Sequence, residues 1–506
     1  MCSNLVFKWT GYIDVEEVII PDGFTEIGEN AFWKCSLLTS ITIPETVTKI
    51  GKNAFSECSS LESITIPNSV IEIGSYAFSG CSSLTSLAIP KSVKCIGESA
   101  FCKCPLLTRI TIPNTVEIFE RRVLFGETRL SGIELPKTIE ILNNNTFIEH
   151  DIKSILIPNS VTEIGSYAFS KFSSITNILI PNSVTLIGSY AFSECSSLSN
   201  IIIPNSVTEI GSYAFSNCKS IISIMIPNSV KKIGSYAFNK CSSLSSITIP
   251  DSITEISSFC FSYCSSLSSI SIPSSVTKIG ENAFRECPSL TNITIPDSVT
   301  EIDSFAFREC SSITSFIIPN GVSVIHSNTF KDCSLLMNIT IPNSVTKIEL
   351  SAFSGCSSLR YIVIPDSVTG IGSYAFSGCS SLRYIEIPDS VIEIGSYAFS
   401  KCSSLRNVTL PNGIAEISEF TFKGCSSLEV IEIPNSVKTI GDNAFRECTF
   451  LQFAIIPGTI TEIGPDAFPY NVRIHWIGDP DYESYSIKKF LKRNWYSNSS
   501  YSGRYK

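Results

Sequence analysis

The sequence predicts an α/β solenoid of about twenty 23-residue coils, each made of a strand, a turn and a short helix, with an elongated or curved form. Two observations predict it. Prolines recur every 23 residues from Pro21 to Pro457, with one 22-residue step from Pro136 to Pro158. Apolar residues also recur at fixed sequence positions before and after these prolines. A fixed period of roughly 20 to 50 residues indicates a solenoid, which builds an extended binding surface more readily than an active site.

The strand comes first in each coil, and the segment around Pro204 shows why. Ile201 and Ile203 share one face of an extended segment because side chains alternate along a strand. Pro204 ends the strand because it has no amide hydrogen to donate. Gly211 then marks a second corner, where the backbone bends sharply or takes a positive φ.

The helix is predicted after this glycine. Ala214, Phe215 and Cys218 lie at i, i+1 and i+4, a spacing that places all three on one face of a short helix. No single coil buries its apolar face alone, so stacked coils bury these faces against each other.

The repeat unit L-x-x-I-x-I-P-x-S-V-x-x-I-G-x-x-A-F-x-x-C-S-S resembles the leucine-rich repeat of the BspA-like type, also called the Treponema pallidum type. The resemblance covers residues 15–470. It implies a leucine-rich-repeat solenoid with its strands on the concave face. Family members are often cell-surface proteins of bacteria and parasitic protists that attach to host or extracellular-matrix proteins. The resemblance brings no catalytic residue and no cofactor.

Composition and targeting signals narrow the function classes. The formal charge is −9, from 37 basic and 46 acidic residues, which does not favour nucleic-acid binding. No apolar stretch approaches the roughly 18 residues of a transmembrane helix, and residues 1–20 lack the pattern of a secretory signal. We therefore expect a non-enzymatic protein that binds a protein ligand. Surface adhesion is the first hypothesis, and a cytoplasmic scaffold or adaptor is the alternative; the oligomeric state stays open.

Sixteen of the twenty cysteines lie fourteen residues after a repeat proline. A column set by the repeat itself predicts small buried apolar groups, while disulfides between adjacent coils stay open. A zinc site is not expected, because the column contains no histidine and no paired cysteines. Cys95 and Cys102 lie off the column and are expected to be the exposed thiols. His150, His326 and His475 are too far apart to form one metal site.

Two departures from the repeat are candidate binding sites. From residue 360 onward, the outward strand positions change to arginine, tyrosine and glutamate, which predicts a contact patch on the concave face with cation–π contacts. This patch consists of Arg360, Tyr361, Arg383, Tyr384, Glu386 and Arg406. The alternative explanation for this patch is a duplicated coil without a role.

The second departure from the repeat covers residues 116–152 and contains Arg121 and Arg122. It is either the decay of two repeats or a bulged loop that forms a secondary binding site.

The two ends are predicted to close the solenoid. Residues 1–14 are expected to form an N-terminal cap, and residues 471–496 a C-terminal cap. Residues 486–496 have the spacing of a basic amphipathic helix, which either covers the last coil or makes peripheral membrane contact. The tail at 497–506 is expected to be disordered.

Overall fold

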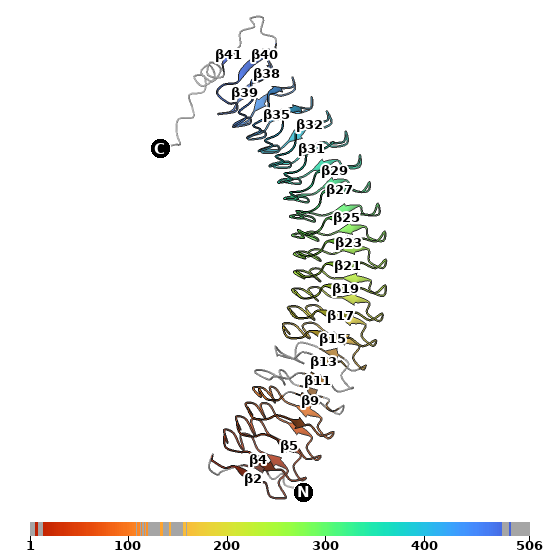
Figure 1. The fold of residues 1–506 in the computed structure, drawn as a ribbon, viewed down its shortest axis with the longest axis vertical. Coiled ribbons are helices and arrows are strands. Elements are labelled where there is room, and N and C mark those ends of the chain that lie inside the picture. The colour runs from red at the N-terminus through yellow and green to blue at the C-terminus, as the bar shows by residue number, and fades with distance from the viewer. Residues whose placement is uncertain are drawn as a thin grey trace, which may run out of the picture. The chain divides into compact units, whose positions relative to one another are not determined.

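The computed structural model describes residues 6–8, 14–107, 109–111, 113, 116, 118–119, 132–134, 141–142, 155–157, 159–477 and 485–486. The chain divides into two units, Met1–Ile253 with Tyr263–Ser265, and Thr254–Ser262 with Ser266–Lys506. Each unit is a stack of coils of roughly 23 residues (Figure 1). The solenoid prediction is therefore confirmed.

Each regular coil carries two short strands, one before the repeat proline and one after it. We call the strands before the proline the upstream row. In the first unit this row consists of β2 (Glu17–Ile19), β4 (Ser40–Thr42), β7 (Leu87–Ala88), β9 (Arg109–Thr111), β11 (Gly132–Glu134), β13 (Ile155–Leu156), β15 (Asn177–Leu179), β17 (Asn200–Ile202), β19 (Ser223–Met225) and β21 (Ser246–Thr248). In the second unit it consists of β23 (Ser269–Ser271), β25 (Asn292–Thr294), β27 (Ser315–Ile317), β29 (Asn338–Thr340), β32 (Tyr384–Glu386), β34 (Asn407–Thr409), β36 (Val430–Glu432), β38 (Phe453–Pro457) and β40 (Arg473–Ile477).

The strands after the proline form the downstream row. In the first unit they are β1 (Val6–Phe7), β3 (Glu26–Ile27), β5 (Lys49–Ile50), β6 (Glu72–Ile73), β8 (Cys95–Ile96), β10 (Ile118–Phe119), β12 (Ile141–Leu142), β14 (Glu163–Ile164), β16 (Leu186–Ile187), β18 (Glu209–Ile210) and β20 (Lys232–Ile233). In the second unit they are β22 (Glu255–Ile256), β24 (Lys278–Ile279), β26 (Glu301–Ile302), β28 (Val324–Ile325), β30 (Lys347–Ile348), β31 (Gly370–Ile371), β33 (Glu393–Ile394), β35 (Glu416–Ile417), β37 (Thr439–Ile440) and β39 (Glu462–Ile463).

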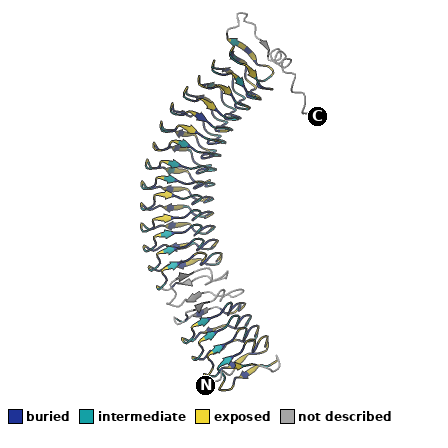
Figure 2. Ribbon diagram, turned by 180° about the vertical axis from the view of Figure 1, so that it is seen from behind, coloured by how far each residue is buried: buried dark blue, intermediate teal, exposed yellow. Residues whose placement is uncertain are grey.

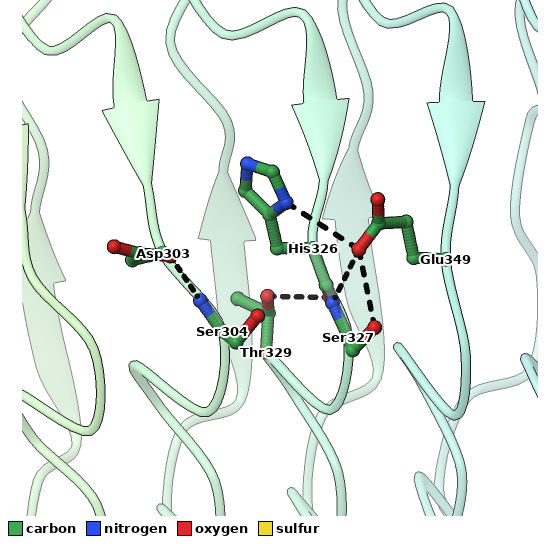
Figure 3. Close-up of polar contacts among 6 residues, drawn as sticks. All are labelled: Asp303, Ser304, His326, Ser327, Thr329 and Glu349. Carbon is green, nitrogen blue, oxygen red and sulfur yellow. Dashed lines mark hydrogen bonds and ion pairs between the residues drawn. The ribbon is translucent and has the colours of Figure 1, made fainter.

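Neighbouring coils pair in parallel and in register, so equal repeat positions form columns. Asn177, Ile178 and Leu179 of β15, for example, lie opposite Asn200, Ile201 and Ile202 of β17. The two rows lie on opposite faces of the coils and run in opposite directions, as Figure 3 shows. In the three-residue upstream strands whose side chains are described, the middle residue is buried or, in β25 and β34, half-buried, and its two neighbours are exposed (burial is coloured in Figure 2), which follows from the alternation of side chains. The exposed positions are therefore free to vary.

The core consists of aligned columns, of which phenylalanine and cysteine are the most regular. Phe215 is fully buried, and its ring stacks parallel on Phe192 with ring centroids 5.3 Å apart. Cys218 is a buried free thiol whose Sγ donates to the carbonyl oxygen of Phe192 at 3.0 Å. Every described column cysteine is likewise buried and forms no disulfide, so the predicted burial is confirmed. Cys95 is half-exposed, but Cys102 is only 3% exposed because it packs inside beside Ser79, so the expected exposure of Cys102 is wrong.

The predicted short helix is wrong: the described segments after the glycine corner are successive tight turns. Tyr213 and Asn217 have left-handed backbones, with φ of 59° and 64°, which a continuous helix does not allow. Alternate amides also have different acceptors. The N–H groups of Ala214 and Ser216 bond within the coil, whereas the Phe215 N–H bonds to Ala237 O of the next coil at 2.8 Å. The neighbouring coil therefore supplies carbonyl acceptors that the amides of a continuous helix would not use, because those amides would bond within the helix.

The corner glycine serves close packing between coils. A Cβ atom on Gly211 would lie 2.5 Å from the backbone nitrogen of Ser189 in the preceding coil. Its φ is not positive, so of the two explanations predicted for this glycine, the tight approach of backbones is the relevant one.

The predicted caps lie largely outside the described residues. Within 1–14, β1 continues the downstream row by pairing with β3. Within 471–496, β40 pairs with β38, and β41 (Tyr485–Ser486) pairs antiparallel with β40. The remainder of the amphipathic segment 486–496 and the tail 497–506 are outside the described part of the chain.

Candidate functional site

The three arginines of the predicted patch lie in consecutive coils of the second unit, each five residues before a repeat proline. Their backbones are hydrogen-bonded in series, from Arg383 N to Arg360 O at 3.3 Å and from Arg406 N to Arg383 O at 3.0 Å. All three side chains are exposed. Among the ion pairs of the described residues, none involves these guanidinium groups. The coil stack therefore holds a row of cations available to an external ligand.

Two tyrosines lie beside this row on the upstream face. Tyr361 is 57% exposed and Tyr384 is 42% exposed, so both side chains are accessible to a ligand. The Tyr384 hydroxyl donates to Glu386 Oε2 at 3.3 Å, so the structure brings these two predicted residues together. The expected cation–π contacts between arginine and tyrosine are absent from the patch residues, all of which the structure describes.

A pocket of about 770 Å³ opens next to these tyrosines. Its lining includes Tyr361, Val363, Asp366, Tyr384, Glu386, Asp389 and Asn412. It lies where the upstream row is interrupted: β29 pairs with β27 and β32 pairs with β34, while Tyr361–Val363, in the coil between them, belongs to no described strand. The sequence-predicted tyrosines and Glu386 line this pocket, whereas the three arginines lie outside its lining.

Sequence reasoning missed the residues that complete the pocket. Asp389 Oδ1 accepts hydrogen bonds from the Asn412 backbone N–H at 2.9 Å and from its side-chain Nδ2 at 3.1 Å. These bonds hold the pKa of the Asp389 carboxyl below its ordinary value, because they stabilise the charged form. A signal was present in the sequence, since Asp366 and Asp389 follow their repeat prolines in successive coils where many other coils have asparagine.

A second polar cluster lies at the corner position of three successive coils, where Asp303, His326 and Glu349 replace glycine (Figure 3). His326 Nδ1 lies 3.4 Å from Glu349 Oε2. The same oxygen accepts from the backbone N–H and the hydroxyl of Ser327, each at 3.1 Å. Because the serine hydroxyl bonds to the carboxylate and not to the imidazole, the cluster lacks the serine–histidine contact of a nucleophilic site. Its hydrogen bonds link adjacent coils.

Other predicted features have no described geometry. Arg121 and Arg122, the secondary binding site, lie outside the described residues. Within the described part of the chain, no group of three or more histidine, cysteine, aspartate or glutamate side chains is arranged to hold a metal ion. No helix among the described residues has the length and apolar character needed to cross a membrane.

Comparisons with known proteins agree with this architecture. A family model described as BspA type Leucine rich repeat region (6 copies) matches residues 4–125, 121–245, 231–360 and 346–475. A leucine-rich repeat protein from Bacteroides ovatus is 34% identical with a TM-score of 0.60, and the match covers 64% of this chain and 84% of that one. A leucine rich cell surface protein from Faecalibacterium prausnitzii is 31% identical with a TM-score of 0.33, over 54% of this chain and 84% of that one. No curated protein matches.

Proposed function

The chain belongs to the BspA-type leucine-rich-repeat family, and from that premise we propose that it is a non-enzymatic protein whose arginine–tyrosine patch binds a protein partner. Repeat solenoids of this kind are suited to protein interaction because stacked coils present a continuous surface. The observation that carries the proposal is the patch itself. Three exposed arginines without ion-pair partners lie beside two exposed tyrosines on consecutive coils. Arginine and tyrosine are the residue types most enriched at binding hot spots.

The finer proposal is attachment at a cell surface, to a host or matrix protein. An intracellular scaffold or adaptor is the second candidate, and it is favoured because the described cysteines form no disulfides, as is typical of reducing compartments. The exposed glycosylation sequon Asn407-Val408-Thr409 sets a condition for adhesion through the patch. Asn407 lies opposite Tyr384 in the β32–β34 register, so a glycan there would cover the patch. Patch-mediated adhesion therefore requires an unmodified Asn407.

The first test is location. Intact cells are labelled with a membrane-impermeant amine reagent, and this chain is recovered for mass spectrometry, with a known cytosolic protein as leakage control. Labelled lysines and an unmodified Asn407 support adhesion. Labelling no greater than that of the control would exclude adhesion and leave the intracellular scaffold.

The second test is binding through the patch. Purified protein is applied to immobilised matrix proteins, and a variant with Arg360→Glu, Arg383→Glu and Arg406→Glu is compared with the natural chain. We expect at least about a tenfold loss, because charge pairs at a binding surface are replaced by like-charge contacts. The matched control carries the same charge change at exposed lysines outside the patch, Lys231→Glu, Lys401→Glu and Lys438→Glu. Equal losses in both variants would show that net charge, and not the patch, governs binding.

A further inference from the structure

We propose that the pocket beside Tyr361 and Tyr384 binds the cationic side chain of a lysine or arginine presented by the protein partner. This inference rests on the proposed function and specifies the chemistry that the partner supplies. It assigns the pocket and the arginine row different tasks, since the arginines do not line the pocket.

The first argument is the position of the pocket in the coil stack. Elsewhere in this part of the second unit, upstream strands pair with a neighbour, as β27 does with β29 and β32 with β34. Tyr361–Val363, which the structure describes, belongs to neither pair. The pocket lies directly over this interruption and spans three coils, from Tyr361 to Asn412. Its lining includes Tyr361, Tyr384 and Glu386, residue types that most other coils lack at the same positions.

The second argument is charge. Asp366, Glu386 and Asp389 contribute three carboxylates to the lining, and no lysine or arginine lines the pocket. Hydrogen bonds from Asn412 keep Asp389 charged to lower pH than an ordinary aspartate, because they lower its pKa. The pocket therefore favours a cation.

The third argument separates an amino-acid side chain from a bare metal ion. Val363, which is 55% exposed, adds an apolar side chain to the lining beside the two tyrosine rings. Exposed apolar groups of this kind pack against methylene groups, as they do against the stems of lysine and arginine whose charged heads reach polar surroundings. The two exposed tyrosine rings offer faces for a cation–π contact with the head group. Apolar stem and cationic head together match lysine or arginine.

The test uses small probes with the full-length protein. Saturation-transfer NMR is recorded with N-acetyl-lysine methylamide and N-acetyl-arginine methylamide, and with N-acetyl-norleucine methylamide as an uncharged probe of similar stem. We expect the cationic probes to bind at least about fivefold more tightly than norleucine, with the strongest transfer on the side-chain methylenes. Equal binding of norleucine would overturn the proposal and leave an apolar pocket only.

Substitutions then locate the site. The double variant Glu386→Gln, Asp389→Asn removes two charges from the pocket, and we expect about a fivefold loss of the cationic probes. Proline followed by asparagine occurs in many other coils, so Asp389→Asn restores a sequence that folds there. The matched control is Glu432→Gln, Asp297→Asn, which changes exposed residues at the same repeat positions outside the pocket. Equal effects in the two variants would overturn the proposal.

The experiments distinguish a failure of the patch proposal from a failure of the cation-site proposal. Loss of partner binding in the arginine variant with no probe binding to the pocket would refute the cation site and keep the patch. Probe binding that depends on Glu386 and Asp389, with partner binding unaffected by the arginine variant, would refute the patch and keep the cation site.

Discussion

Two glycines of one coil, Gly370 and Gly372, provide a direct test of how the coils pack. The perturbation is the same at both positions, a single Gly→Ala change. A Cβ atom on Gly370 meets nothing within 4 Å, whereas a Cβ on Gly372 would lie 2.6 Å from the carbonyl carbon and 3.0 Å from the carbonyl oxygen of Glu349 in the preceding coil. Neither glycine has a positive φ, so alanine is free of backbone strain at both.

The magnitude follows from these contacts. At both positions alanine restricts the unfolded chain, which stabilises the folded state by about 0.4–1 kcal/mol. At Gly372 the backbones must also separate by several tenths of an ångström, and forcing extra atoms into a packed region costs about 1–3 kcal/mol. Because the entropic gain is common to both variants, the free energy of unfolding of the Gly370→Ala variant should be about 1–3 kcal/mol higher than that of the Gly372→Ala variant. Asp303, His326 and Glu349 carry a Cβ at this corner, so the backbone can yield without unfolding.

The assay is native-state hydrogen exchange read by mass spectrometry, because a long repeat array does not unfold as one two-state unit. Peptides that cover residues 345–395 report the stability of the affected coils. We expect faster exchange for Gly372→Ala and unchanged or slower exchange for Gly370→Ala. Equal exchange in the two variants would refute the claim that close backbone approach is the reason for the corner glycine.

Three further predictions concern the core. Phe376→Ala removes a ring that stacks between Phe353 at 5.3 Å and Phe399 at 5.4 Å, so we expect the free energy of opening of these coils, measured by native-state hydrogen exchange, to fall by about 3–5 kcal/mol, and a fall below about 1 kcal/mol would contradict the stacked core. In native protein at pH 8, a thiol reagent should modify Cys95 before any described column cysteine, and the column should react only after denaturation. Burial raises the pKa of Cys402 from 9.0 to about 12; the folded state therefore keeps this proton to higher pH than the unfolded chain. The contribution of the Cys402 proton to folding stability is therefore complete below pH 9 and is lost as the pH rises toward 12. Thermal unfolding at pH 7–11 should show a fall in Tm that begins above pH 9. This fall should be smaller in the Cys402→Ala variant.

The candidate site was predictable in part. The change from small residues to arginine and tyrosine at Arg360 and Tyr361 is visible in the repeat alignment, and alternation along the strand predicts that Tyr361 points outward. The pocket was not predictable in this way. Its lining comes from three coils, and it lies at a lost strand pairing that no single repeat reveals. Asp389 and Asn412 line the pocket from adjacent coils and are hydrogen-bonded to each other, a contact that neither coil reveals alone.

The sequence by itself determined the period, the buried columns and the outward strand positions, because each of these follows from where apolar residues and prolines recur within one coil. Phe215 and Cys218 are buried as their spacing indicates. Only the tertiary structure decided the conformation of the segment that contains them. An isolated segment with this spacing favours a helix, but stacking offers the Phe215 amide a carbonyl acceptor in the next coil, and turns that use both acceptors replace the helix. The choice between helix and turns thus depends on hydrogen bonds between residues 22 positions apart, which no local pattern contains.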